Sequence, residues 1–374
     1  MRYPVAKPDL SGNELAYVTQ AVQSSWVSSQ GEFLGRLESA CREFLGAEHV
    51  LLCTNGTVAL HLALIGANIG PGDEVIVPTL TYVASANAVH YCGATPVFAD
   101  SLPDTWCLDP ESVRRLITPR TKAIMPVHLY GQPCDMAALR DIAAEHGLAL
   151  IEDAAEALGS RIDGRHVGTM GDFGTFSFFG NKLITTGEGG LVVCKRAEDL
   201  ERITLVAHQG MNPERRYWHS VIGYNYRMTN VAAAIGVAQM ERVADFLEHR
   251  VRLANWYFKR LRHQPTLTLP RDVPDTTHAY WMYGLLLREP ALRDPLLRVM
   301  AERGIETRPF FYPIHEFPMY RDAPTDRGCP VAADVSRRGL CLPSYFALAE
   351  SNVVEIVAEL TASLASLLPK RRAA

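Results

Sequence analysis

The sequence has 374 residues, of which 48% are hydrophobic and 21% charged, a composition that excludes a disordered or collagen-like chain. Its 37 basic and 41 acidic residues give a formal charge of −4, which offers no general attraction to nucleic acid or to anionic lipid. At roughly 150 residues per domain, the length predicts two or three domains with a large buried core.

The sequence gives no sign of a membrane span or a secretion signal. No uninterrupted apolar run approaches the roughly 20 residues needed to cross a bilayer, and residues 1–8 lack the apolar core of a signal peptide. The eight cysteines include no C-x-x-C pair, which argues against a zinc cage and a disulfide framework. We therefore expect a cytoplasmic protein with reduced, mostly buried thiols, no bound metal, and no membrane or nucleic acid partner.

Short β-rich segments alternate with helical segments between residues 48 and 195. In chain order, the patterns predict a strand at 49–53, a helix at 57–65, a strand at 74–77, a helix at 83–91, strands at 96–99 and 123–127, a helix at 135–146 and a strand at 148–152. The alternation predicts an α/β fold, in which a mainly parallel sheet is covered by helices on both faces.

The second half of the chain begins with a long amphipathic segment. From 239 to 261 apolar residues recur every three or four positions, which predicts one helix with a single buried stripe. A second alternation follows, with a strand at 279–287, a helix at 291–303, a strand at 305–310 and a final helix at 350–367. We place a domain boundary near residue 250, between a large domain (1–250) and a smaller C-terminal domain (251–374). The basic tail at 370–372 is expected to be a solvated end.

The connection after the first core strand carries small polar residues. No G-x-G-x-x-G follows an early strand and no G-x-x-x-x-G-K-[ST] occurs, which disfavours dinucleotide and P-loop sites. Instead, Thr54-Asn55-Gly56-Thr57 opens directly into a helix. Backbone N–H groups at such a helix N-terminus can bind a phosphate. Taken alone, a plain helix cap by Asn55 or Thr57 is the simpler explanation.

Two acidic residues, Glu152 and Asp153, end an apolar strand. In open α/β sheets the carboxyl ends of the strands face the ligand crevice, so we expect Asp153 to lie where chemistry takes place. A carboxylate there could bind a metal, cap the next helix, or pair with a cationic nitrogen of a cofactor. By itself, capping would be the preferred interpretation.

Lys182 follows the aromatic segment Phe176-Ser177-Phe178-Phe179-Gly180-Asn181, and a glycine-rich segment comes after it at 185–190. Desolvation among such residues lowers the pKa of an amine and frees it to react with an aldehyde. The alternative is a lysine that extends its charged end to the surface after a buried strand. Together, a phosphate-binding turn, a strand-end aspartate and a partly buried lysine are the parts that bind pyridoxal 5′-phosphate (PLP).

Longer strings of residues support this interpretation. The chain resembles the DegT/DnrJ/EryC1/StrS family of PLP-dependent nucleotide-sugar aminotransferases from Pro8-Asp9-Leu10-Ser11 through Leu342-Pro343 and the final helix. Within the family, the strings at 123–131 and 210–218 are most similar to those of GDP-perosamine synthases. The resemblance implies the fold-type-I PLP architecture, with a large cofactor domain and a smaller α+β C-terminal domain.

The resemblance also implies roles for the two principal candidates. Lys182 would carry the cofactor covalently and, once released by the amino donor, move the proton between cofactor and substrate carbon. Asp153 would pair with the pyridine nitrogen and keep it protonated, so that the ring can accept electrons.

Five further positions match the family's cofactor contacts. By resemblance, Gly56, Thr57 and Ser177 bind the phosphate and Tyr82 stacks on the pyridine ring, although simple core packing could explain an isolated tyrosine. By the same resemblance, Glu156 would lie near the phenolic oxygen of the cofactor, where a carboxylate would need a shared proton.

Three more positions concern the partner subunit and the substrate. The family is dimeric, and the position of Asn225 would reach the phosphate of the partner subunit's cofactor, so we expect a homodimer with shared active sites. An isolated Asn would otherwise be taken as a turn residue. The segment 304–315 resembles the family's substrate loop, with Arg308 and His315 as candidate contacts to sugar or diphosphate. His315 could equally be a structural histidine.

Retention of the lysine bears on the reaction. Some relatives replace it by histidine and dehydrate a nucleotide-linked keto-deoxysugar, whereas this chain keeps Lys182. The resemblance therefore implies transamination, with L-glutamate as donor and GDP-4-keto-6-deoxymannose converted to GDP-perosamine. The alternatives are the same chemistry on a 3-keto GDP sugar, a dTDP- or UDP-linked 4-keto sugar or an aminocyclitol precursor, a PLP-dependent sugar dehydratase, or a regulatory protein that retains the fold.

Overall fold

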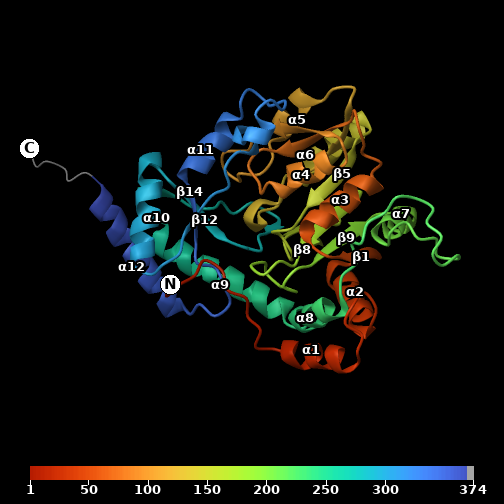
Figure 1. Ribbon diagram of the computed structural model, residues 1–374. Coiled ribbons are helices and arrows are strands. Elements are labelled where there is room, and N and C mark those ends of the chain that lie inside the picture. The colour runs from red at the N-terminus through yellow and green to blue at the C-terminus, as the bar shows by residue number, and fades with distance from the viewer. Residues whose placement is uncertain (369–374) are drawn as a thin grey trace, which may run out of the picture.

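A seven-stranded sheet, described here from a computed structural model of residues 1–368, forms the centre of the N-terminal part of the molecule (Figure 1). The strand order is β1-β9-β8-β5-β4-β2-β3. The strands are β1 (His49–Cys53), β2 (Glu74–Pro78), β3 (Thr95–Ala99), β4 (Thr121–Ile124), β5 (Ala149–Asp153), β8 (Phe173–Ser177) and β9 (Gly190–Cys194). Strand β9 pairs antiparallel with both neighbours and the other pairs are parallel, which confirms the predicted mainly parallel sheet.

Helices cover both faces of this sheet, and further helices belong to the C-terminal part of the chain. They are α1 (Glu14–Gln23), α2 (Glu32–Leu45), α3 (Gly56–Gly66), α4 (Ala84–Tyr91), α5 (Pro110–Leu116), α6 (Met136–His146), α7 (Ala197–Ala207), α8 (Asn230–Met240), α9 (Val243–Leu261), α10 (Arg293–Glu302), α11 (Pro330–Arg338) and α12 (Glu350–Leu367). The basic tail at 370–372 lies outside the described residues.

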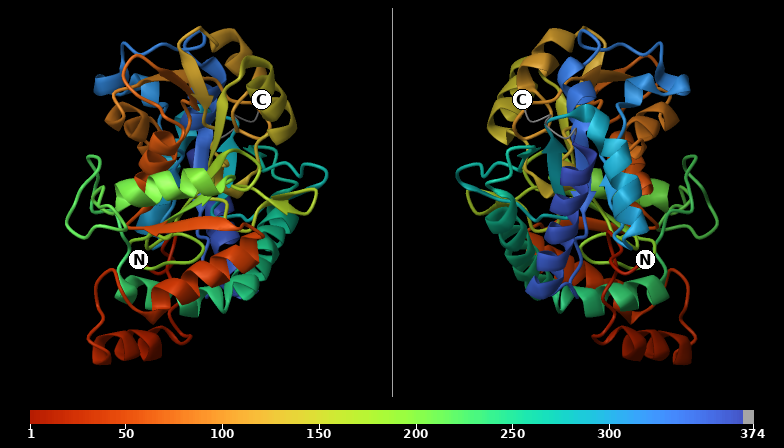
Figure 2. Two further views of the ribbon diagram at one scale, coloured as in Figure 1. Left: turned by 90° about the vertical axis from the view of Figure 1, so that its right-hand side faces the viewer. Right: turned by 90° about the vertical axis from the view of Figure 1, so that its left-hand side faces the viewer.

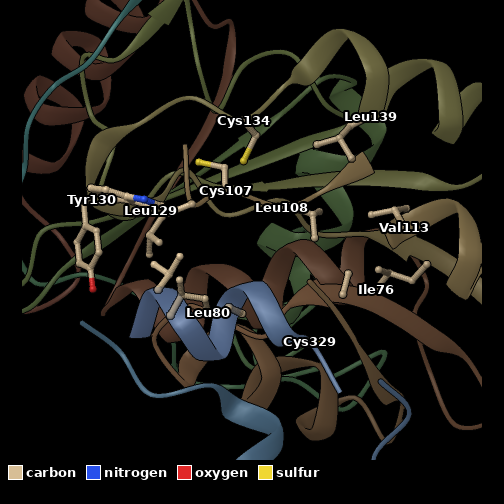
Figure 3. Close-up of a cluster of buried hydrophobic side chains, with 14 of the residues drawn as sticks. Ile76, Leu80, Cys107, Leu108, Val113, Leu129, Tyr130, Cys134, Leu139 and Cys329 are labelled. Carbon is tan, nitrogen blue, oxygen red and sulfur yellow. The ribbon is translucent and has the colours of Figure 1, made fainter. Parts of the chain in front are cut away.

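Strand β2 shows how the sheet sorts its side chains. Val75 and Val77 pack in a cluster with α3, α4 and α7 on one face. Ile76, between them, packs on the other face with Val113 of α5 and Leu139 of α6 (Figure 3). Successive strand side chains point to opposite faces, so an all-apolar strand needs cover on both sides. A third cluster joins β1 and β9 to α2 and α8.

A second, antiparallel sheet organises the C-terminal part. Its order is β10-β12-β14-β13, formed by β10 (Leu267–Thr268), β12 (Tyr283–Leu287), β14 (Gly339–Leu342) and β13 (Arg308–Pro309). Helices α9, α10 and α12 bury their apolar stripes against it, and Figure 2 shows α10 and α12 side by side on that side of the molecule. A small third sheet contains β6 (Arg161–Ile162), β7 (Arg165–His166) and β11 (Thr276–Thr277).

The predicted helix at 239–261 is wrong in its extent, because the structure divides this segment between α8 and α9. The two residues between them contact the N-terminal segment instead of continuing a helix. Arg242 Nη1 lies 2.6 Å from Asp9 Oδ1, and Glu241 accepts hydrogen bonds from Asn13 and Tyr17. These tertiary contacts break a pattern whose apolar period continues without interruption. Residue 250 lies inside α9, which joins the two parts of the chain, and the domain boundary placed there stays a prediction.

Two predicted strands are shorter than expected. The strand at 279–287 begins only at Tyr283, because Tyr280 has a left-handed backbone with φ 46° that a strand cannot contain. The strand at 305–310 reduces to Arg308–Pro309 in the sheet, while Ile305 bridges to Tyr3 near the N-terminus. The first residues of the chain therefore pack against the C-terminal part.

The cysteines and the helices bear on two further expectations. All eight cysteines lie within residues 1–368 and are unpaired, and seven of them are buried, which confirms the expected thiols. In the same range, no helix combines the length and the apolar character needed to cross a membrane.

Candidate active site

A cavity of about 610 Å³ lies where the carboxyl ends of the parallel strands meet the C-terminal sheet. Two sets of residues line it. We call the first the large-sheet wall, which contains Asn55, Gly56, Thr57, Tyr82, Ser85, Asp153, Glu156, Ser177 and Lys182. We call the second the small-sheet wall, which contains Trp281, Met282, Arg308, Phe311 and Cys341. Parallel strands present their carboxyl ends at one edge of a sheet, so residues far apart in the sequence converge there.

Lys182 projects into this cavity from the turn that follows β8. Its side chain is only 14% exposed, and its Nζ lies 3.9 Å from the centroid of the Trp281 ring and 3.8 Å from Glu156 Oε1. Burial lowers the pKa of Lys182, although the carboxylates of Glu156 and Asp153 act in the opposite direction. The lysine is therefore enclosed and does not extend to the surface, which disposes of the alternative considered for it.

Asp153 is the last residue of β5 and faces the cavity with its carboxylate buried. Its Oδ2 accepts a hydrogen bond from Ser85 Oγ at 2.8 Å, and its Oδ1 accepts one from the backbone N–H of Ala155 at 3.1 Å. Burial raises the pKa of Asp153, while these bonds and the charge of Lys182 lower it. No helix begins after β5, so Asp153 does not act as a helix cap.

Glu156 lies beside Lys182 and is held by a strained backbone. Its Oε2 accepts a 2.7 Å hydrogen bond from the N–H of Tyr130, whose φ of 54° places a bulky residue in the left-handed region. Burial and the nearby Asp153 raise the pKa of Glu156 to about 7, although Lys182 and the Tyr130 N–H oppose the shift. The carboxyl can therefore gain or lose a proton near neutral pH.

The start of α3 forms a cradle suited to a phosphate. Asn55 is the helix cap, since its Oδ1 accepts from the N–H of Val58 at 2.9 Å. This leaves the N–H groups of Gly56 and Thr57 without a partner within residues 1–368, at the edge of the cavity. A Cβ on Gly56 would lie 2.8 Å from Ser177 Cβ, so only glycine allows β8 to approach this closely.

Tyr82 projects from the connection between β2 and α4 and is 60% exposed. Its ring centroid lies 5.9 Å from that of Phe311 across the cavity. An exposed aromatic ring, a phosphate cradle, a strand-end carboxylate and an enclosed amine thus border a single cavity. In this order, they suit the pyridine ring, the phosphate, the ring nitrogen and the aldehyde of PLP.

Of the three remaining predicted residues, only Arg308 lines the cavity. Its Nε lies 3.1 Å from Glu306 Oε1. His315 lies outside, where its Nδ1 is 2.7 Å from Thr79 Oγ1 and burial lowers its pKa. Asn225 is exposed on the segment after α7 and does not line its own chain's cavity.

Several site residues have no signal in the sequence. Ser85 orients Asp153 from the first turn of α4, and Trp281 covers Lys182 from 99 positions away in the chain. Behind Asp153, the fully buried Glu152 accepts from Gly168, Met170 and Gly171 N–H groups and pairs with His128 Nε2 at 3.1 Å. Only the approach of distant segments gives these residues their roles. The described residues contain no group of three or more His, Cys, Asp or Glu side chains placed to hold a metal.

This fold and this cavity define a PLP-dependent aminotransferase. The sequence model of the DegT/DnrJ/EryC1/StrS aminotransferase family matches residues 8–361, and the chain belongs to this family. The expected family, fold, enzyme class and cofactor are therefore confirmed.

Individual relatives match over almost their full lengths. The chain is 48% identical over 362 residues to the GDP-perosamine synthase of Caulobacter vibrioides, with 96% of this chain and 97% of that one covered. It is 46% identical over 357 residues to the GDP-perosamine synthase of Escherichia coli O157:H7, with 95% and 97% covered. The crystal structure of the aminotransferase TlmJ from Streptoalloteichus hindustanus has a TM-score of 0.93 at 32% identity, with 98% of this chain and 100% of that one covered.

Proposed function

We propose that this enzyme transfers the amino group of L-glutamate to GDP-4-keto-6-deoxymannose and releases GDP-perosamine and 2-oxoglutarate. The observation that carries the proposal is its 45–48% identity to GDP-perosamine synthases from three organisms, over 94–96% of this chain. The retained Lys182 supports transamination over the dehydration that relatives with histidine at this position perform.

The large-sheet wall supports the proposed cofactor contacts. When bound, PLP carries the amino group between donor and acceptor and accepts electrons from the substrate carbon. Gly56 and Thr57 would bind its phosphate with free N–H groups, and Ser177 with its hydroxyl. Asp153 would hold a proton on the ring nitrogen, because a cationic partner stabilises the carboxylate that burial alone disfavours. Tyr82 would cover one face of the ring.

Lys182 is the proposed proton carrier. Its amine lies among Trp281, Glu156 and Asp153, where burial lowers its pKa and so favours the neutral form that can accept a proton. A flexible four-carbon side chain can take a proton from one carbon and return it to another within the same cavity.

Arg308 is the proposed contact of the nucleotide sugar, and His315, which lies outside the cavity, is proposed only to position the substrate loop. Arg308 lines the cavity and has a permanent charge with forked donors, a geometry that suits a diphosphate. The ring of His315 pairs with Thr79, which follows β2, and this contact holds the C-terminal end of the substrate loop (304–315).

We also propose a homodimer in which Asn225 completes the phosphate site of the partner subunit. Asn225 is exposed, and the same segment of the chain carries the exposed apolar side chains of Tyr217, Trp218 and Ile222, which supports an interface there. Mixing inactive Lys182→Ala and Asn225→Ala chains should restore activity, since a mixed dimer then contains one native site. Absence of recovery in a mixed dimer of demonstrated composition would contradict the shared site.

We further propose that the enzyme is located in the cytoplasm. The eight unpaired cysteines suit such a reducing compartment.

The substrate is tested by incubating the purified holoenzyme with L-glutamate and each candidate ketone, followed by mass analysis of the product. We expect an amine only, or fastest, from GDP-4-keto-6-deoxymannose, and none with Lys182→Ala. Faster amination of a 3-keto GDP sugar, a dTDP- or UDP-linked 4-keto sugar or an aminocyclitol precursor would overturn the substrate assignment. A product that lacks a hydroxyl and contains no nitrogen in the sugar would identify a dehydratase.

A further inference from the structure

Glu156 and Lys182 form an enclosed ion pair whose geometry suggests a second use for the glutamate. The two side chains are 4% and 14% exposed, and Glu156 Oε1 lies 3.8 Å from Lys182 Nζ. The other oxygen, Oε2, is already occupied by the Tyr130 N–H at 2.7 Å. The free oxygen of the carboxylate is therefore the one that faces the amine.

Other ionisable groups face Glu156 from every element packed around it: Tyr130 after β4, Asp153 on β5, Lys182 after β8, and Cys341 on β14, with Arg308 of β13 in the same cavity. Burial raises the pKa of both the Tyr130 phenol and the Cys341 thiol far above neutral, so neither exchanges protons there. Arg308 stays charged and pairs with Glu306. Asp153 is another acid, and both of its oxygens already accept hydrogen bonds from Ser85 and Ala155. Among these groups, Lys182 is the one that places a proton donor near the free oxygen of Glu156, with Nζ 3.8 Å from Oε1.

We propose that Glu156 is a further catalytic residue of the transamination, beside Lys182 and Asp153. It takes the surplus proton brought by the ammonium group of the amino donor and so leaves Lys182 a neutral base. In this step an N–H bond of the ammonium at Lys182 breaks and an O–H bond forms on Glu156 Oε1. The charged pair becomes a neutral amine and a neutral carboxylic acid, so nothing is oxidised or reduced. This inference rests on the proposed function for the chemistry of the site but not for the identity of the sugar.

The physical basis is the opposite effect of burial on an acid and on an amine. Removing water disfavours both charged forms, and it therefore brings the neutral pair closer in energy to the ion pair than it is in solution. The raised pKa of Glu156, about 7, and the lowered pKa of Lys182 agree with this direction.

The backbone at Tyr130 fits a functional orientation of the carboxyl group. Its φ of 54° lies in the left-handed region, which is strained for a bulky residue, and the N–H of this residue donates to Glu156. The same hydrogen bond fixes which oxygen faces Lys182.

The first test uses the cofactor-free chain and requires no substrate. Brief acetylation over a series of pH values, with mass analysis of the Lys182 peptide and the exposed Lys259 as internal standard, gives the pH of half-maximal reaction. Removing a neighbouring carboxylate lowers the pKa of an amine by roughly 1–3 units, so Glu156→Gln should move this pH downward. Glu188→Gln, a carboxylate change on the same cavity, should leave it in place. A misfolded variant would move it upward instead, toward that of an exposed lysine.

The second test follows the visible band of the bound cofactor after addition of L-glutamate alone. Without a local proton acceptor, Glu156→Gln should slow this half-reaction by about 100-fold, and a small buffer base should restore the rate in proportion to its concentration. The wild-type rate should not depend on the buffer. The proposal requires both results, and an unchanged labelling pH or a buffer-independent variant rate would overturn it. Failure of the sugar assignment alone would alter neither readout, because neither uses the sugar.

Discussion

The two walls of the cavity contribute different things. The large-sheet wall carries the chemical groups, and each follows a strand end or begins a helix: Gly56 at α3, Asp153 on β5, and Ser177 and Lys182 at and after β8. The small-sheet wall is dominated by Trp281, Met282, Phe311 and Cys341, and Arg308 is its one charged residue.

The difference shows that the small-sheet wall affects the groups of the large-sheet wall by excluding solvent from them. An aspartate and a lysine on an open sheet edge would keep ordinary pKa values, whereas burial shifts the pKa of Asp153 up and that of Lys182 down. The chemical groups belong to one wall, and their tuning requires both. Three substitutions test this division and a fourth, outside the cavity, provides a contrast; they follow from the largest expected effect to the smallest.

Asp153→Asn removes one negative charge from the large-sheet wall and keeps the shape of the side chain. An amide cannot hold a proton on the ring nitrogen, so we expect kcat to fall by about 100- to 1,000-fold, the range for loss of one preorganised electrostatic group. PLP should still bind. Steady-state kinetics with saturating cofactor measure the change. Full activity in the asparagine variant would show that the chemistry does not depend on this acid.

Gly56→Ala tests the phosphate cradle of the same wall. The new Cβ would lie 2.8 Å from Ser177 Cβ, and overpacking of this kind costs about 1–3 kcal/mol. We expect PLP to bind about 5- to 150-fold more weakly, since about 1.4 kcal/mol is tenfold in affinity. Spectroscopic titration of the cofactor-free chain measures this. Gly180→Ala is the matched control, because a Cβ there meets nothing within 4 Å, and equal weakening by both would contradict the cradle.

Trp281→Ala tests the tuning supplied by the small-sheet wall. Water beside the amine should raise the pKa of Lys182, because burial is the main cause of its lowered value. Each unit of increase reduces the neutral fraction of the amine about tenfold at neutral pH. The acetylation experiment measures the pKa, and Trp281→Phe, which keeps an aromatic face over Nζ, should change it less. An unchanged pKa in the alanine variant would falsify the role assigned to this wall.

The smallest effect on catalysis is expected at His166 of β7, which does not line the cavity. Among residues 1–368, neither ring nitrogen of the buried His166 has a partner with good hydrogen-bond geometry, although the backbone of Phe44 lies near enough to oppose the loss of its proton. Burial, with the charge of Arg161, lowers the pKa of His166 to about 4. The unfolded chain takes up this proton below about pH 6.5, so stability is fully present above that pH and decreases by up to about 1.4 kcal/mol per unit toward pH 4.

His166→Phe should flatten this part of the pH dependence and leave kcat unchanged, because the substituted ring keeps its place beside Phe44. Urea unfolding at several pH values measures the slope. An identical slope in wild type and variant would show that another group dominates the acid response.

The sequence predicted the large-sheet wall well because its groups are local to regular elements. The strand at 49–53, the helix that starts beside Gly56 and the strand that ends near Asp153 all have clear periods, and each places a polar residue at a known end of the sheet. The prediction failed at 239–261, where contacts of Asp9, Asn13 and Tyr17 end one helix and begin another.

By itself, then, the sequence determined the sheet and its helices, since periodicity is a local property. Its longer strings of residues determined the family, and with it the lysine, aspartate and glycine that we propose bind PLP. Only the tertiary structure decided that Ser85 orients Asp153, that Trp281 encloses Lys182, and that a strained Tyr130 turns one oxygen of Glu156 toward the amine. These are properties of segments brought together by folding. Desolvation and hydrogen-bond geometry, which set a pKa, arise only when such segments meet.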